Sequence, residues 1–233
     1  MLRMIGHRLS GRNGREIAAL LAKNVAHVLR QASPAAAIER HRKGAFDRRW
    51  GTETTRLVNL SALSVDQQRA RHGVRYQPSS GDVVSQAVEI LGLRPQDHSF
   101  VDYGSGKGRI CMIAAQAGFR RVIGVEFSSE LCAVAERNFE RFVEAGGASR
   151  KPEAVLGDAG AFDPPAGPLL AYLYNPFSPP VLDEVVARLA AKAKAGDPVF
   201  ACYVEPQHLP AFAGWTLLHR EHEVALLQAP AAA

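Results

Sequence analysis

The chain has 233 residues, of which 47% are apolar and 22% charged, enough for one hydrophobic core with room for an appended subdomain. No apolar run approaches the roughly 20 residues that a membrane-spanning helix needs, and polar residues interrupt the basic N-terminus where a secretory signal would be apolar. Cys111, Cys132 and Cys202 are far apart and lie in expected helices or strands. We therefore expect buried thiols of a cytoplasmic protein, with no disulfide framework and no metal site.

The charge is unevenly distributed along the chain. Residues 1–76 carry fifteen Lys/Arg against five Asp/Glu, whereas residues 77–233 carry thirteen against eighteen. The basic third has two interpretations, a solvated basic face or a docking surface for an acidic macromolecule.

The N-terminal third begins with an amphipathic pattern. Apolar residues recur on one helical face between Asn13 and Arg30, Asn13 and Glu16 have capping-box spacing, and Pro34 ends the pattern. An Arg-rich connector follows, and "AFDRRWGTETTRLVNL" is typical of loops and short elements. We expect residues 1–75 to form a basic, mainly helical extension and residues 76–233 to form the main domain.

From Tyr76 onward, strand and helix patterns alternate. The expected strands cover about 98–103, 121–127, 153–156, 169–174 and 198–204, with helices near 83–91, 109–117, after Ser128 or Ser129, and from Pro179 to Lys194. Two further strands, near 215–219 and 224–228, have no helix between them. This order predicts an α/β, Rossmann-like sheet of seven strands, mostly parallel, with an antiparallel C-terminal hairpin.

A glycine turn, Gly104-Ser105-Gly106-Lys107-Gly108, follows the first strand. A dinucleotide fingerprint needs a third glycine where Arg109 stands, and a P-loop needs Ser or Thr where Gly108 stands. The turn is therefore expected to approach a ligand closely without binding phosphate. Asp102, two residues earlier, would repel phosphate and attract an ammonium or sulfonium group.

The next three strands also end in residues that bind ligands. Glu126 at the second strand can accept hydrogen bonds from both hydroxyls of a ribose, and Asp158 after the third can accept from an adenine amino group. The fourth ends in Tyr174-Asn175-Pro176-Phe177. Four consecutive strands thus deliver such residues to the carboxyl edge, where open α/β sheets bind ligands.

These motifs resemble those of the class I S-adenosylmethionine-dependent methyltransferases: "VDYGSGKG" their first motif, "GVEF" their ribose acid, "GDA" their adenine contact and "YNPF" their acceptor motif. The resemblance covers about Tyr76 to the C-terminus. It implies the Rossmann-like methyltransferase fold and S-adenosyl-L-methionine as cofactor. The cofactor-binding residues that it implies are Asp102, Tyr103, Gly104, Ser105, Gly106, Gly108, Glu126, Phe127, Asp158, Ala159 and Asn175.

Within this class the pattern is most similar to the non-SET histone-lysine methyltransferases, the disruptor-of-telomeric-silencing family, and to bacterial methyltransferases of unassigned substrate. Tyr76, the "FVD-GSG-G" turn, the "GVE" acid, Asn175 and Phe177 carry this similarity, whereas Pro176 departs from it. Asn-Pro-Phe also resembles, in part, the N-P-P-[FY] motif of amino-group methyltransferases. The resemblance implies N-methylation of a protein lysine or another amino group, with Asn175, Phe177 and Tyr76 as catalytic residues.

Other functions stay open at this stage. The chain could be a non-catalytic module that binds adenosylmethionine or nucleic acid, or a methyltransferase for a small molecule; a dehydrogenase is disfavoured by Arg109. Tyr76, Tyr103, Tyr174 and Phe177 could form an aromatic wall around a sulfonium. Glu205, after the fifth strand, is the only spare acid near the expected acceptor site.

Overall fold

The computed structural model describes residues 44–55, 82–174, 177, 179–221 and 223–231, and those from Phe46 onward belong to one compact unit. Several expectations lie outside the described residues: the helix between Asn13 and Arg30, the boundary at 75/76, and the side chains of Tyr76 and Asn175. Within the described residues, no helix is both long and apolar enough to cross a membrane.

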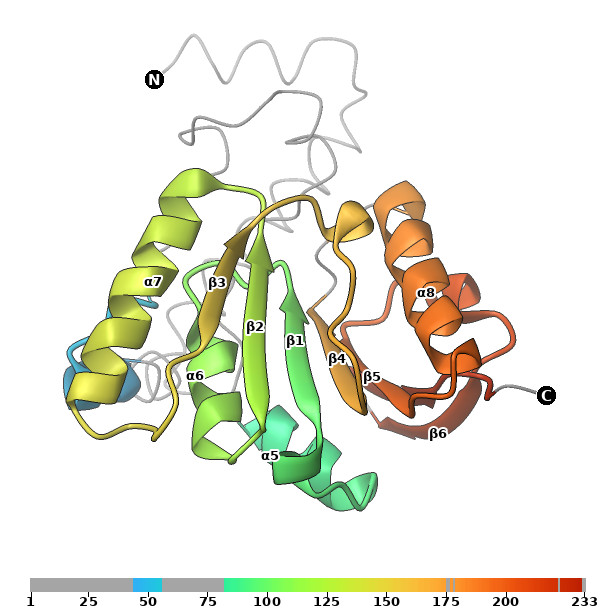
Figure 1. Ribbon diagram of the computed structural model, residues 1–233, viewed down its shortest axis with the longest axis horizontal. Helices are drawn as coiled ribbons and strands as arrows, with labels where there is room; N and C mark the ends of the chain where they lie inside the picture. Colours follow the sequence, from blue (N-terminus) through green and yellow to red (C-terminus); the bar gives the residue numbers. More distant parts are fainter. Residues whose placement is uncertain (1–43, 56–81, 175–176, 178, 222, 232–233) are drawn as a thin grey trace, which may run out of the picture. The chain divides into compact units, whose positions relative to one another are not determined.

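Seven strands form one sheet in the order β3-β2-β1-β4-β5-β7-β6 (Figure 1). They are β1 Ser99–Tyr103, β2 Arg121–Glu126, β3 Glu153–Leu156, β4 Leu169–Tyr174, β5 Val199–Val204, β6 Thr216–Glu221 and β7 Val224–Gln228. The first five pair in parallel, and β7 pairs antiparallel with both β5 and β6. This confirms the expected seven-strand Rossmann-like sheet with a C-terminal hairpin.

Helices cover both faces of the sheet. They are α5 Asp82–Ile90, α6 Arg109–Gln116, α7 Ser129–Glu144 and α8 Pro179–Lys194, with short 3-10 turns η2 Pro95–Asp97, η3 Ala159–Ala161 and η4 Leu209–Phe212; residues 44–50 are also helical. One apolar cluster joins the sheet to α8, η3 and η4, and another joins the opposite face to α5, α6, α7 and the helix at 44–50.

Strand β1 lies between these two clusters and is buried along its whole length. Val101 and Tyr103 point into the α8 side, and Phe100 points into the α6 side. The glycine turn begins where β1 ends, and within it Gly104 is half-buried while Ser105 to Gly108 are buried.

Helix α7 shows how local sequence directs this packing. The Ser128 hydroxyl accepts the Leu131 N–H at 3.2 Å and caps the helix, as one of the two expected serines. The expected inward face is buried, and it consists of Leu131, Ala135, Phe139 and Phe142. Asn138, a polar residue on the same face, is buried as well.

Two details differ from expectation. Ile90, an apolar residue within the helix expected near 83–91, is 47% exposed because it lies at the last position of α5. Cys132 is only half-buried, since it lies in the first turn of α7 beside the inward-facing Leu131; Cys111 and Cys202 are fully buried.

Candidate functional site

The glycine turn is held against β2 by its own backbone. The N–H groups of Gly104 and Ser105 both donate to the carbonyl of Val125, at 2.9 and 3.1 Å. Gly108 has φ +80°, and a Cβ there would overlap the ring of Phe139 on α7. Glycine at this position therefore permits both the left-handed backbone and the close approach of α6 to α7.

Glu126 ties the turn to the end of β2. Its Oε2 accepts the Gly106 N–H at 2.8 Å, and its Oε1 accepts the Ser128 N–H at 2.9 Å. Burial raises the pKa of Glu126, while these backbone N–H groups partly oppose the shift. A carboxylate offers about four lone-pair directions, so Glu126 retains acceptor capacity for two ribose hydroxyls while it holds the turn.

Asp102 is buried below the turn, 4% exposed, and the thiol of Cys111 lies 3.8 Å from its Oδ2. Burial, together with the negative charge of Glu126, raises its pKa to about 8. Gly124 is the partner of Asp102 on β2. A Cβ at Gly124 would lie 2.6 Å from the Ser105 hydroxyl, so only glycine at position 124 leaves room for the turn.

The loop after β3 continues the same edge. The Gly157 N–H donates to the Glu126 carbonyl at 3.0 Å, which brings the two strand ends together. Asp158 turns one carboxylate oxygen to the Gly160 N–H at 3.0 Å, and Ala159 is buried. Glu126, half-buried Phe127 and Asp158 thus follow one another along the edge. Their contacts with ribose and adenine stay predictions.

The acceptor side of the edge is built from β4 and β5. The Tyr174 hydroxyl at the end of β4 donates to Glu205 Oε1 at 2.6 Å, and half-burial of the phenol raises its pKa, as does that carboxylate. Glu205 has φ +48°, the only positive φ of a non-glycine residue in the described part of the chain, and its N–H donates to the Glu223 carbonyl at 2.6 Å. The expected spare acid therefore lies beside the fourth strand on strained backbone.

Two aromatic residues of the expected site are packed in the core. Phe177 and Tyr103 are both buried in the cluster under α8, and Tyr103 meets Phe162 edge-to-face at 6.1 Å. Their expected roles toward an acceptor or a sulfonium stay predictions, and both rings stabilise the end of the sheet where they lie.

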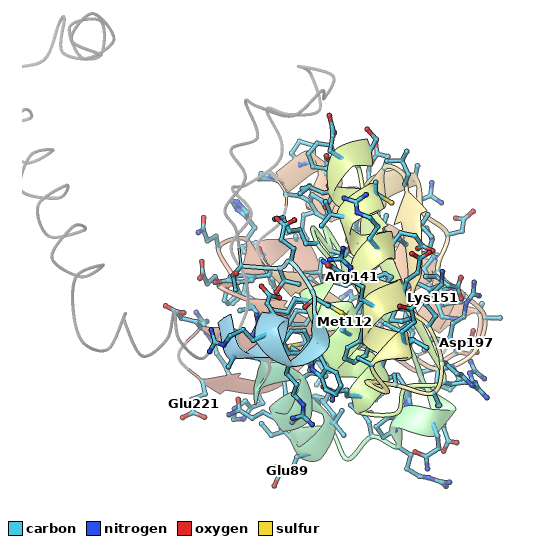
Figure 2. All side chains as sticks on the ribbon, turned by 90° about the vertical axis from the view of Figure 1, so that its left-hand side faces the viewer. Glu89, Met112, Arg141, Lys151, Asp197 and Glu221 are labelled. Carbon is cyan, nitrogen blue, oxygen red and sulfur yellow. The ribbon has the colours of Figure 1, made fainter. Side chains whose placement is uncertain are left out.

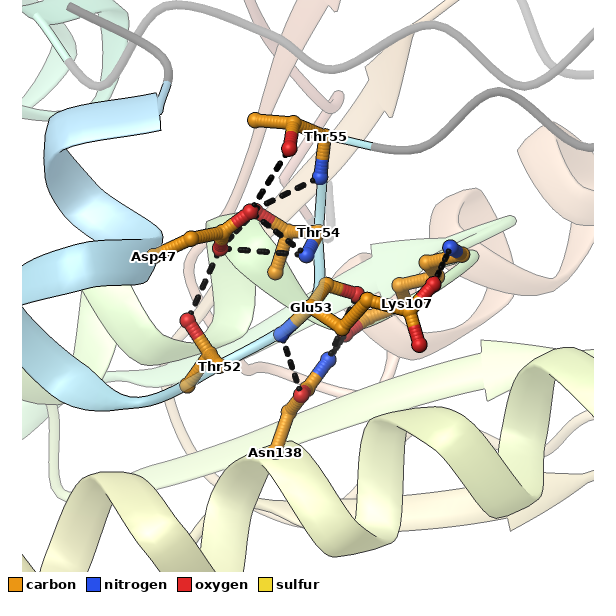
Figure 3. Close-up of polar contacts among 7 residues, drawn as sticks. All are labelled: Asp47, Thr52, Glu53, Thr54, Thr55, Lys107 and Asn138. Carbon is orange, nitrogen blue, oxygen red and sulfur yellow. Dashed lines mark hydrogen bonds and ion pairs between the residues drawn. The ribbon is translucent and has the colours of Figure 1, made fainter.

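Residues 46–55 also reach the glycine turn, a contact that the sequence-based expectations did not include (Figure 3). The amide of Asn138 on α7 binds the backbone of both Glu53 and Lys107, and Arg141, labelled in Figure 2, donates to the Gly51 carbonyl at 3.1 Å. The sequence held one signal for this contact: Asn138 interrupts an otherwise apolar helical face, and a buried amide needs partners.

The order of the strands and the acids at their carboxyl ends agree with the fold of the class I S-adenosylmethionine-dependent methyltransferases. A family model described as "Histone methylation protein DOT1" matches residues 57–148, about two fifths of the chain. This match supports the methyltransferase class, and the narrower family is suggested by that part of the chain alone. No curated protein matches the chain significantly.

Solved structures with a similar fold act on varied substrates. A magnesium protoporphyrin IX methyltransferase from Synechocystis PCC 6803 with bound SAM has 15% identity and a TM-score of 0.48, over 65% of this chain and 78% of that one. An RNA methyltransferase from Salinibacter ruber in complex with S-adenosyl-L-homocysteine has 22% identity and a TM-score of 0.42, over 67% and 94%. A ribosomal protein L11 methylase from Lactobacillus delbrueckii subsp. bulgaricus has 15% identity and a TM-score of 0.45, over 78% and 100%. Likeness at this level says nothing about the acceptor.

Proposed function

We propose that this protein transfers the methyl group of S-adenosylmethionine to an amino group. One observation carries the proposal: Glu126 accepts the N–H of Gly106 in the glycine turn. This contact brings together an acid suited to bind ribose hydroxyls and a glycine turn that lacks the features of a phosphate-binding loop. The Asn-Pro-Phe sequence after β4, one strand away from this point, supports the amino-group acceptor.

The residues of the cofactor half suit that ligand. S-adenosylmethionine, when bound, supplies a methyl group already activated by its sulfonium. Asp102 lies on β1 just before the turn and is buried, so a nearby cation would favour its ionised form and lower its raised pKa. Glu126 and the turn orient the ligand by hydrogen bonds that exist before it arrives, which reduces the cost of ordering.

The acceptor half must present a nitrogen lone pair. An alkyl ammonium, with an unperturbed pKa of about 10.4, has to lose a proton before its nitrogen can bond to the methyl carbon. Among the described residues of the acceptor half, Glu205 is the acid that contacts β4, because it accepts a hydrogen bond from the Tyr174 hydroxyl. In our proposal Asn175 accepts a hydrogen bond from the amine and orients its lone pair, and the Glu205 carboxylate acts as the general base that accepts the proton lost by the ammonium.

The test uses labelled cofactor and calorimetry. Wild-type protein is expected to bind S-adenosylhomocysteine and to transfer labelled methyl groups to amine-bearing acceptors in cell-extract fractions. Glu126→Ala should weaken S-adenosylhomocysteine binding by about 1.5–3 kcal/mol, because the ribose would lose hydrogen bonds to a charged group.

The control is Glu144→Ala, an exposed acid near the end of α7, which should leave binding unchanged. Unchanged affinity in Glu126→Ala would contradict the assignment of Glu126 as the ligand of the ribose hydroxyls. Binding by wild type without any methyl transfer would instead favour the non-catalytic module.

We also propose that the basic N-terminal third docks an acidic acceptor. The excess of Lys and Arg in residues 1–76 supports this proposal. Methylation of an acidic acceptor should then weaken with added salt, because exposed charges are screened beyond about 8 Å at physiological ionic strength. A protein without residues 1–40 that methylates the same acceptor at full rate would contradict it.

A further inference from the structure

Residues 46–55, which we call the anchor segment, form a closed loop of hydrogen bonds beside the glycine turn (Figure 3). Asp47 accepts from the hydroxyls of three threonines and from two backbone N–H groups, at 2.7 to 3.0 Å; the threonines are Thr52, Thr54 and Thr55. Burial alone would raise the pKa of Asp47, but these hydrogen bonds outweigh it and hold the pKa below its ordinary value. The loop therefore keeps one shape, with Glu53 inside the run of threonines.

One buried amide joins this loop to the turn. Asn138 Oδ1 accepts the Glu53 N–H at 2.9 Å, and its Nδ2 donates to the carbonyls of Glu53 at 3.2 Å and Lys107 at 3.0 Å. A second connection runs from Arg109 to Thr54 Oγ1 at 3.2 Å, with the guanidinium 4.6 Å from the Phe46 ring centre. The backbone of Glu53 is thus fixed next to a member of the glycine turn.

The side chains of Lys107 and Glu53 form an asymmetric ion pair. Lys107 Nζ lies 2.7 Å from Glu53 Oε1; the lysine side chain is 2% exposed and the glutamate side chain 50% exposed. A buried ammonium is costly without a partner, so Lys107 holds the carboxylate in place. The second oxygen of Glu53 accepts no hydrogen bond from any other described residue.

Three acids surround the turn, and they differ in what they offer a ligand. Asp102 and Glu126 are both 4% exposed, and both oxygens of Glu126 already accept backbone N–H groups. Glu53 is the one of the three with an open, solvent-facing oxygen. Because Glu53 is paired with Lys107 of the turn, its carboxylate lies next to the turn and is available to the ammonium group of a ligand that binds there.

We propose that Glu53 binds the α-ammonium group at the amino-acid end of the cofactor, with Lys107 and Asn138 as positioning residues. The inference rests on the proposed function, because it assigns one end of the same ligand. It makes the anchor segment part of the cofactor site and predicts that the protein distinguishes ligands with and without that amino group.

Calorimetry with two ligands tests this assignment: S-adenosylhomocysteine and its desamino analogue, in which hydrogen replaces the ammonium. Glu53→Gln should bind S-adenosylhomocysteine at least about tenfold more weakly than wild type, since a charged hydrogen bond is lost. The same variant should bind the desamino analogue within about twofold of wild type, because a double-mutant cycle isolates the contact between the two groups. Equal losses for both ligands, or no loss for either, would overturn the inference.

Glu153→Gln is the matched control. Glu153 on β3 has a side chain that is 45% exposed, similar to that of Glu53, and it forms an ion pair with Arg121 at 2.7 Å. Its variant should bind both ligands as wild type does. Thermal unfolding shows whether Glu53→Gln keeps the fold. If it does not, Glu53→Asp takes its place and should show the same selective loss, because its carboxylate is one methylene shorter. Wild-type protein that fails to bind S-adenosylhomocysteine would contradict the proposed function itself, whereas wild-type binding with an unselective Glu53 variant contradicts this inference alone.

Discussion

The cofactor half and the acceptor half of the same sheet edge are built differently. Around β1 and β2, the acids are buried and Glu126 accepts backbone N–H groups from both the turn and α7. Around β4 and β5, the polar contact is a pair of half-buried side chains, Tyr174 and Glu205, on a strained backbone. The first half is organised by main-chain contacts and the second by side-chain contacts.

This difference has a physical consequence. Backbone hydrogen bonds and glycine packing leave little freedom, so the cofactor half should lose stability and ligand binding together when it is altered. A side-chain pair at an open edge can change with little effect on the fold, so the acceptor half should lose catalysis with little change in stability. Four variants test this contrast.

The largest effect is expected from Gly108→Ala in the cofactor half. Alanine would occupy a left-handed backbone, φ +80°, and its Cβ would overlap the Phe139 ring. We expect the free energy of unfolding, measured by urea denaturation, to fall by about 2–4 kcal/mol. Gly118→Ala is the control, since it has φ +88° and open space around the added Cβ; its loss should be about 1–2 kcal/mol. Equal losses would show that packing against α7 is unimportant.

The next effect concerns the acceptor half and leaves the fold intact. Asn175→Ala should slow methyl transfer by ~10²-fold or more, by analogy with the loss of one preorganised polar group at a reacting centre. Its affinity for S-adenosylhomocysteine should change by less than about 1 kcal/mol, a typical neutral hydrogen bond. Single-turnover kinetics and calorimetry measure the two quantities. Loss of cofactor binding with normal chemistry per bound cofactor would make Asn175 a cofactor ligand or a structural residue.

A pH-dependent effect should separate the buried acid of the cofactor half from exposed acids. The pKa of Asp102 is raised from 3.8 to about 8, so the folded state holds its proton more tightly than the unfolded state. The contribution of Asp102 to stability is therefore fully present below about pH 4, falls as the pH rises from there to about 8, and is constant above that pH. Asp102→Asn should reduce this loss of stability with rising pH. Part of the loss should remain, because the pKa of Glu126 is also raised.

Urea denaturation at several pH values measures the slope. The control is Asp197→Asn. The pKa of half-buried Asp197 is lowered by its hydrogen bond with Lys192, so its contribution to stability is lost only as the pH falls. A slope between pH 4 and 8 that stays the same in Asp102→Asn would mean that this carboxyl is ionised in the folded protein.

The smallest effect is expected from Tyr174→Phe, which removes the donor to Glu205. We expect a stability loss of about 0.5–1.5 kcal/mol and unchanged cofactor affinity, because the contact is half-buried and lies on the acceptor side. Tyr203→Phe, which removes the acceptor of a long 3.3 Å bond from His208 N–H, should cost less. A drop in S-adenosylhomocysteine affinity in Tyr174→Phe would erase the contrast between the two halves.

Much of the fold and part of the candidate site could be predicted from the sequence, because the relevant signals are local. The bounds of β3, β4 and β7 agree with the expected ranges, and Ser128 caps α7 as one of two expected serines. Apolar periodicity, capping residues and the glycine spacing act over a few residues, so they are readable without the fold. Since parallel strands end at one edge, Asp102, Glu126 and Asp158 could also be placed together from strand order alone.

The tertiary structure alone decided how the anchor segment meets the turn. Glu53 is 54 residues from Lys107 and 85 from Asn138 in the chain, and no periodic pattern connects them. Lys107 looked like an ordinary member of a glycine turn and Asn138 like a break in an apolar helix face. The roles of these two residues depend on their burial, because a buried ammonium and a buried amide need hydrogen-bond partners. Which partners are within reach is determined only when the chain has folded.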